Sequence, residues 1–371
     1  MGGGLALAAA AAGLGACGPA PAPRYEVVRL SLPPGVTSAT VNAVYEDGRI
    51  VGQYRASPTE YRFTTLVWDG PRDPEPEQVA PAAWLQGAVS NERGDYGAIT
   101  AVGPSRSTVW VGGERAEVPG EVVDIDERGR VLLRNVDADG SAAIWDDGTL
   151  VPITAPAPPE WDEWPRGMTD DGLVVAASES PTYERVPWVW RDGTAQVLRG
   201  LTEVLPDPAD VNEAGRIVGS AWTAPGTWHP VRWEGGGTPV DLGLPPGGEA
   251  GSAVAVNEVG DVIGRSNGSD GHEDAWLWRD GVMTQLATLG GEFATARALN
   301  DAGVVVGTAT TGQLLVTHAV AWEDGEVTDL GTLGGRESYA IDVDEDGLVV
   351  GTAAGRDQVQ QAVAWLPPAA G

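Results

Sequence analysis

The feature that most constrains the fold is a single unit that recurs eight times along the 371 residues of the chain. One glycine marks a short turn in each unit, at intervals of 35 to 46 residues, at Gly48, Gly94, Gly129, Gly172, Gly215, Gly260, Gly303 and Gly347. A tryptophan follows each of these glycines after 16 to 20 residues, at Trp68, Trp110, Trp145, Trp190, Trp233, Trp278, Trp322 and Trp365. Two independent landmarks that keep the same period eight times indicate a repeat protein.

Each unit has the pattern of four short β-strands. In the seventh unit, the stretch ARAL leads into the turn NDAG, a valine-rich run, a variable loop, the strand HAVAW, an Asp-Gly turn and the strand VTDL. Asx-Gly turns between alternating apolar runs are typical of hairpins, and the pattern lacks the 3.6-residue period of a helix. The 52 glycines and 28 prolines suit a chain with many turns. We therefore predict an all-β fold, an eight-bladed β-propeller of four-stranded blades.

The eighth unit lacks its fourth strand, because only LPPAAG follows Trp365. The matching segment stands at the other end, where YEVVRLSLPPG at 25–35 resembles TPVDLGLPPG at 238–247 in the fifth unit. Pairing of this segment with the last blade would remove an open sheet edge. We predict that residues 25–32 close the last blade, so that 25–366 form one propeller and 367–371 a short tail.

The first residues resemble an export signal. The apolar stretch LALAAAAAGL at 5–14 is too short to cross a bilayer, and it leads into Leu14-Gly15-Ala16-Cys17. This order resembles a bacterial lipobox, in which the cysteine is lipidated. We predict a lipoprotein-type signal peptide at 1–17 with lipidation at Cys17, followed by a Pro-rich tether at 18–24. The protein would be anchored to the outer face of the bacterial cell membrane or secreted; an Ala-rich leader with a chance cysteine is the alternative.

The charge balance excludes several classes of partner. The chain has 53 acidic and 23 basic residues, a net charge of −30, and every basic residue is arginine. Such a surface repels nucleic acid and anionic lipid headgroups. We predict no nucleic-acid partner, membrane contact only through the lipid anchor, and a monomer.

One acidic turn has the pattern of a metal site. Asp342, Asp344 and Asp346 precede a glycine in the D-x-D-x-D-G order that begins a calcium loop. The glutamate expected at the twelfth loop position is replaced by Ala353. The sequence favours an ordinary turn without a cofactor or metal, with Ca²⁺ as the alternative.

No catalytic group stands out. His229 and His318 occupy one repeat position, four residues before a landmark tryptophan, which indicates packing or hydrogen bonding at a strand end. Ser266 lies in a G-x-S-x-G sequence, but this segment falls between predicted strands rather than in the strand-turn-helix setting of a nucleophile. A single cysteine and three histidines exclude a Cys/His metal cluster. We therefore predict no catalytic residue.

The remaining tryptophans fall into two groups. Trp188 and Trp276 lie two residues before landmark tryptophans and are predicted to be core residues. The others fall in blade-to-blade connections or second-to-third loops, which share one face of a propeller. Aromatic rings beside carboxylates suit carbohydrate or peptide binding there, and packing of these loops on their own tryptophans is the alternative. The candidate ligand-binding residues are Trp84, Trp161, Asp162, Glu163, Trp164, Trp222, Trp228 and His229.

The C-terminal units resemble a known repeat family. HAVAW at 318–322, DLGTLGG at 329–335 and AIDVDEDGLVVG at 340–351 are similar to the HAF extracellular repeat, with Val320 in place of the family's phenylalanine. The likeness is good over residues 253–366. It implies a secreted or surface-attached β-propeller-like protein and implies no reaction.

Two functions follow from these patterns. The first is a non-catalytic extracytoplasmic binding or scaffold propeller anchored to the cell surface, with a carbohydrate, a peptide or an envelope protein as its ligand. The alternative is a propeller hydrolase or lyase that acts on an extracellular polymer or lactone through carboxylates such as Asp162 and Glu163.

Overall fold

The computed structural model describes residues 25–55, 63–82, 89–91, 93, 95–101, 106–137, 140–268, 271–313 and 316–368. The predicted signal peptide with Cys17, the tether, Trp84 and residues 369–371 lie outside these described residues. Every element within them is a β-strand. None of the described residues belongs to a helix that could cross a membrane.

Six of the repeat units each form a four-stranded antiparallel sheet in chain order. The first three sheets consist of β2 (Thr40–Val44), β3 (Ile50–Arg55), β4 (Phe63–Trp68) and β5 (Glu77–Ala82); β6 (Val89–Ser90), β7 (Tyr96–Ala101), β8 (Arg106–Val111) and β9 (Glu114–Pro119); and β10 (Glu121–Ile125), β11 (Val131–Arg134), β12 (Ala143–Asp146) and β13 (Thr149–Pro152). The next three consist of β14 (Asp162–Met168), β15 (Val174–Glu179), β16 (Arg185–Arg191) and β17 (Thr194–Val197); β18 (Asp207–Val211), β19 (Arg216–Trp222), β20 (Trp228–Glu234) and β21 (Val240–Asp241); and β22 (Gly248–Val256), β23 (Val262–Gly268), β24 (Glu273–Arg279) and β25 (Val282–Gln285).

The last two units share one eight-stranded sheet. Its first part contains β26 (Gly290–Leu299), β27 (Val305–Thr311), β28 (Thr317–Glu323) and β29 (Glu326–Asp329). Its second part contains β30 (Gly334–Val343), β31 (Val349–Gly355), β32 (Gln360–Leu366) and β1 (Glu26–Arg29). A single parallel pair, Thr317 with Glu337, joins the two parts. Strand β1 pairs antiparallel with β32, and Val27 lies opposite Trp365.

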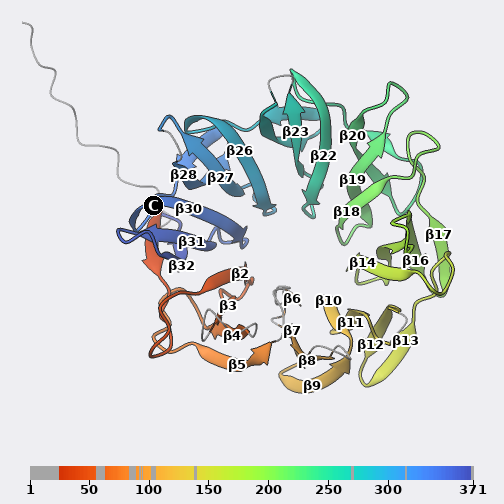
Figure 1. Ribbon diagram of the computed structural model, residues 1–371, viewed down its shortest axis with the longest axis horizontal. Coiled ribbons are helices and arrows are strands. Elements are labelled where there is room, and N and C mark those ends of the chain that lie inside the picture. Colours follow the sequence, from red (N-terminus) through yellow and green to blue (C-terminus); the bar gives the residue numbers. More distant parts are fainter. Residues whose placement is uncertain are drawn as a thin grey trace, which may run out of the picture.

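The sheets lie in a ring around a central opening (Figure 1). The first strand of each unit lies nearest the opening, and the outermost strand lies at the rim. The core is correspondingly divided into separate clusters: one, for example, combines Leu30 and Trp68 with Leu348 and Ala364 from the other end of the chain. Neighbouring sheets therefore bury apolar side chains against each other.

The landmark tryptophans all lie on the third strand of their units. Trp68, Trp233 and Trp365 are fully buried, and Trp190 and Trp322 nearly so. Three of the indoles also donate a hydrogen bond to a carbonyl two residues beyond an outermost strand: Trp68 to Ser31, Trp233 to Arg199 and Trp322 to Ala287, at 2.7 to 2.8 Å. The interpretation of the landmark tryptophans as packing between sheets is confirmed for these five, whereas Trp110, Trp145 and Trp278 are half-buried. The predicted core position of Trp188 and Trp276 is confirmed, since both are fully buried.

The final glycine of the repeat has a packing role. A Cβ at Gly351 would collide with the carbonyl oxygen of Tyr339 on the innermost strand, and one at Gly307 would collide with that of Thr295. Both contacts occur next to a β-bulge in the innermost strand, where the register shifts by one residue. Only glycine allows the second strand to approach the bulge this closely.

Candidate functional site

The turns between the first and second strands bring acidic side chains together around the central opening. The residue two positions before the landmark glycine is acidic in all eight units, at Glu46, Glu92, Glu127, Asp170, Glu213, Glu258, Asp301 and Glu345. Glu92 lies outside the described residues. The other seven form what we call the acidic collar.

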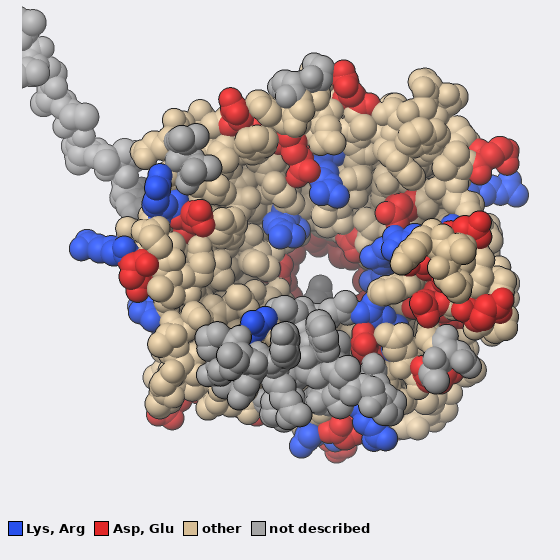
Figure 2. All heavy atoms as spheres, in the orientation of Figure 1, with Lys and Arg blue, Asp and Glu red and all other residues tan. Residues whose placement is uncertain are grey.

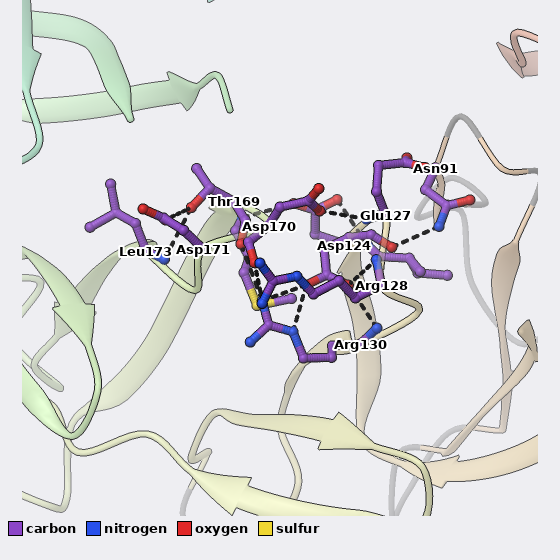
Figure 3. Close-up of polar contacts among 12 residues, drawn as sticks. Asn91, Asp124, Glu127, Arg128, Arg130, Thr169, Asp170, Asp171 and Leu173 are labelled. Atoms are coloured by element: carbon purple, nitrogen blue, oxygen red, sulfur yellow. Dashed lines mark hydrogen bonds and ion pairs between the residues drawn. The ribbon is translucent and has the colours of Figure 1, made fainter. Parts of the chain in front are cut away.

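The collar is held by backbone hydrogen bonds from one unit to the next. The N–H of Glu127 donates to Asp170 Oδ1, and the N–H of Asp170 donates to Glu213 Oε2, both at 2.7 Å. The series continues through Glu258, Asp301 and Glu345 to Glu46, at 2.8 to 3.2 Å. Figure 3 shows the Glu127–Asp170 step, with the Asp170 carboxylate turned toward the neighbouring unit. Because a backbone donor fixes six of the seven carboxylates, all except that of Glu127 in these bonds, the ring of charge is preorganised.

A second layer of acids lies next to the collar, at the bulges of the innermost strands. Asp124, Asp210 and Asp342 occupy the same repeat position and accept the N–H of Met168, Val256 and Val44 in the next unit, at 2.8 to 3.0 Å. The bond from Val44 to Asp342 joins the first unit to the last. These carboxylates, like the collar, therefore link neighbouring units while facing the central space.

Five of the seven collar residues and all three acids of the second layer line a cavity of about 850 Å³. Arg166 is the single basic residue among the described residues that line it. Nine acidic residues line the same cavity, namely Glu46, Asp124, Asp126, Glu127, Asp170, Asp210, Glu213, Glu258 and Asp342. The opening passes into the molecule in Figure 2, with acidic side chains visible on its wall. A cavity lined so strongly by one sign of charge concentrates the field and attracts cations.

Burial, together with the neighbouring carboxylates, raises the pKa values of several acids that line the cavity. Burial and the neighbouring charges of Asp170 and Glu258 raise the pKa of Glu213 to about 7. Burial raises the pKa of Asp124, of Asp210 and of Asp342 to about 6 in each case, against the hydrogen bonds that favour the charged form. We call the central opening with this cavity the acidic channel. Its carboxyl groups therefore take up protons between pH 8 and pH 5, a range in which ordinary carboxyl groups stay ionised.

We expect the protein to be more stable at pH 5.5 than at pH 8. A carboxyl whose pKa is raised by folding contributes stability that is fully present below its unfolded pKa, about 4, and is lost as the pH rises through its folded pKa. For the channel acids this loss falls between pH 4 and about 7. Thermal unfolding at constant ionic strength should show a Tm that falls by several degrees from pH 5.5 to pH 8.

The variant Glu213→Gln provides the control, since it removes one titrating group and keeps the acceptor oxygen for the N–H of Asp170. Its Tm should depend less on pH above pH 6. A wild-type Tm that rises or stays constant from pH 5.5 to pH 8 would contradict this account of the channel acids.

The predicted group at residues 161–164 lies at the start of an innermost strand rather than in a connecting loop, because β14 begins at Asp162. Glu163 accepts the N–H of Ala142, at 2.6 Å, and the Trp164 ring lies under the Arg134 guanidinium at 4.7 Å. These contacts join the third and fourth units. None of the four residues lines the acidic cavity.

The other predicted residues lie in the fifth unit. Trp222 and Trp228 face each other across one hairpin, with ring centroids 5.4 Å apart and nearly perpendicular planes. His229 Nδ1 lies 3.0 Å from the carboxylate of Asp241, and His318 makes the same contact with Asp329 at 2.9 Å. The strand-end hydrogen bonding predicted for this histidine position is confirmed.

Two of the three aspartates of the D-x-D-x-D-G sequence, Asp342 and Asp344, accept hydrogen bonds from backbone groups. Asp342 accepts the N–H of Val44, as described above, and Asp344 Oδ1 accepts the N–H of Leu348 at 2.7 Å. The described residues contain no group of three or more His, Cys, Asp or Glu side chains arranged to hold a metal ion.

Sequence reasoning missed the acidic collar, although a signal was present. The aligned units show an acid two residues before every landmark glycine. That position was interpreted as part of an ordinary turn. Its significance depends on the ring, which brings residues about 43 positions apart to one opening.

Comparisons with known proteins agree on the fold. No protein-family model and no curated protein sequence matches the chain. The β-propeller domain of the Trilobed protease from Pyrococcus furiosus, described as having an open velcro topology, is similar over 89% of this chain and 96% of its own, with 12% identity and a TM-score of 0.52. Dipeptidyl peptidase 4 from Porphyromonas gingivalis is similar over 86% of this chain, with 10% identity and a TM-score of 0.62. The match spans 57% of that peptidase. At these identities the likeness shows the fold alone, and it confirms the prediction of an all-β propeller.

Proposed function

We propose that the protein is an exported binding propeller that holds a cationic ligand in its central channel. The preferred ligand is a lysine- or arginine-rich segment of an extracellular or envelope protein. The observation that carries this proposal is the acidic residue at one position of every unit: the seven that the structure describes form the acidic collar, and five of these line a cavity of about 850 Å³.

The chemistry of the channel favours amino and guanidinium groups. Six of the seven collar carboxylates accept a backbone N–H from the preceding unit, and five of the collar residues line the cavity. Several such charges around one axis suit a ligand that carries several positive charges in a row. Phosphates and other anions are disfavoured by the same field.

Titration calorimetry with the full-length protein tests this function. Tetralysine should bind in a saturable manner at low salt and more weakly as salt increases, while tetraglutamine should not bind. The triple variant Glu127→Gln, Glu213→Gln, Glu258→Gln keeps the acceptor oxygens and should bind tetralysine at least about tenfold more weakly, since each exposed charge pair contributes up to about 1 kcal/mol. Equal binding of the two peptides would refute the proposal.

We further propose that the channel belongs to an eight-bladed propeller closed by β1. The Trp68 indole donates to Ser31, two residues beyond β1, just as Trp233 and Trp322 donate to carbonyls two residues beyond β17 and β25. This equivalence supports β1 as the outermost strand of the last blade. We also propose that the protein is related to the HAF-type repeat family and that a lipid is attached at Cys17. Incorporation of a labelled fatty acid into wild type, but not into Cys17→Ser, would support the lipid anchor.

A hydrolase or lyase is the second candidate, and one observation favours it. The pKa of Glu213 is raised to about 7, so this carboxyl can both give and take a proton at neutral pH, and it lies beside Asp170 in the cavity wall. A screen of extracellular polymers and lactones with wild type and Glu213→Gln would test it. Turnover that is lost in the variant, with folding intact, would establish catalysis; absence of turnover in wild type would leave the binding role.

A further inference from the structure

A second cavity lies between the sheets of the fifth and sixth units. Its volume is about 490 Å³, which suits a small ligand. The residues that line it come from the starts of β18, β20 and β22, from the ends of β19 and β23, and from the start of β24. These ends lie on the face away from the first-to-second turns, so the cavity is separate from the acidic channel.

A buried hydroxyl in the wall of this cavity lacks a partner. Ser266 is 1% exposed, and its Oγ has no hydrogen-bond partner among the residues that the structure describes. It belongs to β23, so the G-x-S-x-G sequence forms part of a regular strand, not the loop expected from the sequence. Since an unpaired buried hydroxyl costs free energy, Ser266 is ready to bond with a group that enters the cavity.

The equivalent serine of the fourth unit, Ser178, does have a hydrogen-bond partner. There Ser178 accepts a hydrogen bond from the Trp188 indole, at 2.8 Å. The equivalent Trp276 is buried, and its Nε1 has no partner in the described structure. The Trp276 ring fills the space that a Cβ at Gly264 would occupy, whereas Ala176 stands at the equivalent place in the fourth unit. Because of this difference, the Trp276 indole does not donate a hydrogen bond to Ser266.

The other groups around the cavity complement a sugar. Trp228 is half-buried and is held edge-to-face by Trp222, so its indole offers a fixed apolar surface. Asp207 and Glu273 supply carboxylates, and Arg265 lies 3.7 Å from Glu273 and donates to Ser252 Oγ at 3.4 Å. An indole stacks on the C–H face of a pyranose, while carboxylates, a guanidinium and hydroxyls bond to its hydroxyl groups.

We propose that this cavity is a saccharide-binding site for one or two neutral hexose residues of a glycan. Each carboxylate is paired with a guanidinium, Asp207 with Arg166 at 4.0 Å and Glu273 with Arg265 at 3.7 Å, so the charges of the cavity are balanced and favour a neutral sugar. Trp228 provides the stacking surface, Ser266 provides the buried hydrogen bond, and Asp207, Glu273 and Arg265 hold the ring hydroxyls. The proposal is independent of the acidic channel, because none of these five residues lines that cavity.

Calorimetry with maltose, cellobiose and N,N′-diacetylchitobiose on the full-length protein tests the site. At least one of these disaccharides should bind with one site per chain. Trp228→Ala should weaken that binding by at least about tenfold, as loss of a central aromatic contact does. Ser266→Ala should also weaken it without lowering the Tm, since the hydroxyl has no partner within the described protein. Tyr183→Ala, at an exposed aromatic residue outside the cavity, should leave the affinity unchanged.

Ser252→Gln fills the cavity from a half-buried position and should abolish binding even if Trp228→Ala fails to fold. Absence of binding for all three disaccharides would overturn the proposal. It would equally be overturned by wild-type affinity in folded Trp228→Ala and Ser252→Gln proteins.

Discussion

Deletion of residues 24–32 is expected to lower the melting temperature of the protein by about 10 °C, an effect of several kcal/mol for a domain of this size. The deletion removes β1 and with it four register pairs to β32, from Glu26 with Leu366 to Arg29 with Val363. It also removes Leu30, which is 1% exposed and packs in the cluster that joins the first and last units. The open edge of β32 would then face solvent.

The matched control is deletion of residues 18–23, which shortens the predicted tether and leaves β1 in place. Its melting temperature should equal that of the full chain. If both deletions leave the Tm unchanged, β1 does not close the last blade, and the first and last units are held by the bonds of Asp342 and Glu345 and by the apolar contacts of Trp68.

Replacement of Trp68 by alanine should destabilise the protein by about 4 kcal/mol, in the range for a buried tryptophan. The side chain is fully buried, lies against Gly52 and donates from its indole to Ser31 at 2.7 Å. The substitution therefore leaves a large cavity between the first and last units and an unpaired carbonyl. Urea unfolding with linear extrapolation measures the loss.

Trp145→Ala is the comparison for this prediction. Trp145 is the landmark of the third unit, but it is only half-buried. Less apolar surface is lost there, so we expect a cost of about 1 to 2 kcal/mol. Equal losses at Trp68 and Trp145 would show that the landmark tryptophans do not act through packing between sheets.

Much of the fold could be predicted because each repeat unit contains its own turn glycine and its own packing tryptophan. The turn glycines take positive φ, as at Gly260 with 96°, and the tryptophans fall on the third strand in every unit. The pairing of β1 with β32 corresponds to a segment similarity that is visible in the sequence. One strand boundary differs from the prediction. Residues 162–164 are predicted to lie in a connection between blades, but they belong to β14, whose first residues contact the neighbouring unit.

The candidate sites were harder to predict, because they depend on how units meet. Asp124, Asp210 and Asp342 look like ordinary strand residues until the bulge turns them toward the next unit. The Ser266 hydroxyl lacks a partner because the Trp276 indole lies over Gly264, and no pattern in the sequence specifies this position of the indole. The tryptophans that the sequence predicts on one face separate into a packing group at 161–164 and a cavity wall at Trp228.

The central claim, that the collar rather than the overall charge of −30 binds the cationic ligand, is tested most directly by comparing two variants of equal charge. One carries Glu127→Gln, Glu213→Gln and Glu258→Gln in the collar. The other carries Glu114→Gln, Glu160→Gln and Glu203→Gln at exposed positions outside the channel cavity. Calorimetric titration with tetralysine at constant ionic strength should give wild-type affinity for the second variant and at least about tenfold weaker binding for the first. Equal affinities for the two variants would contradict the account.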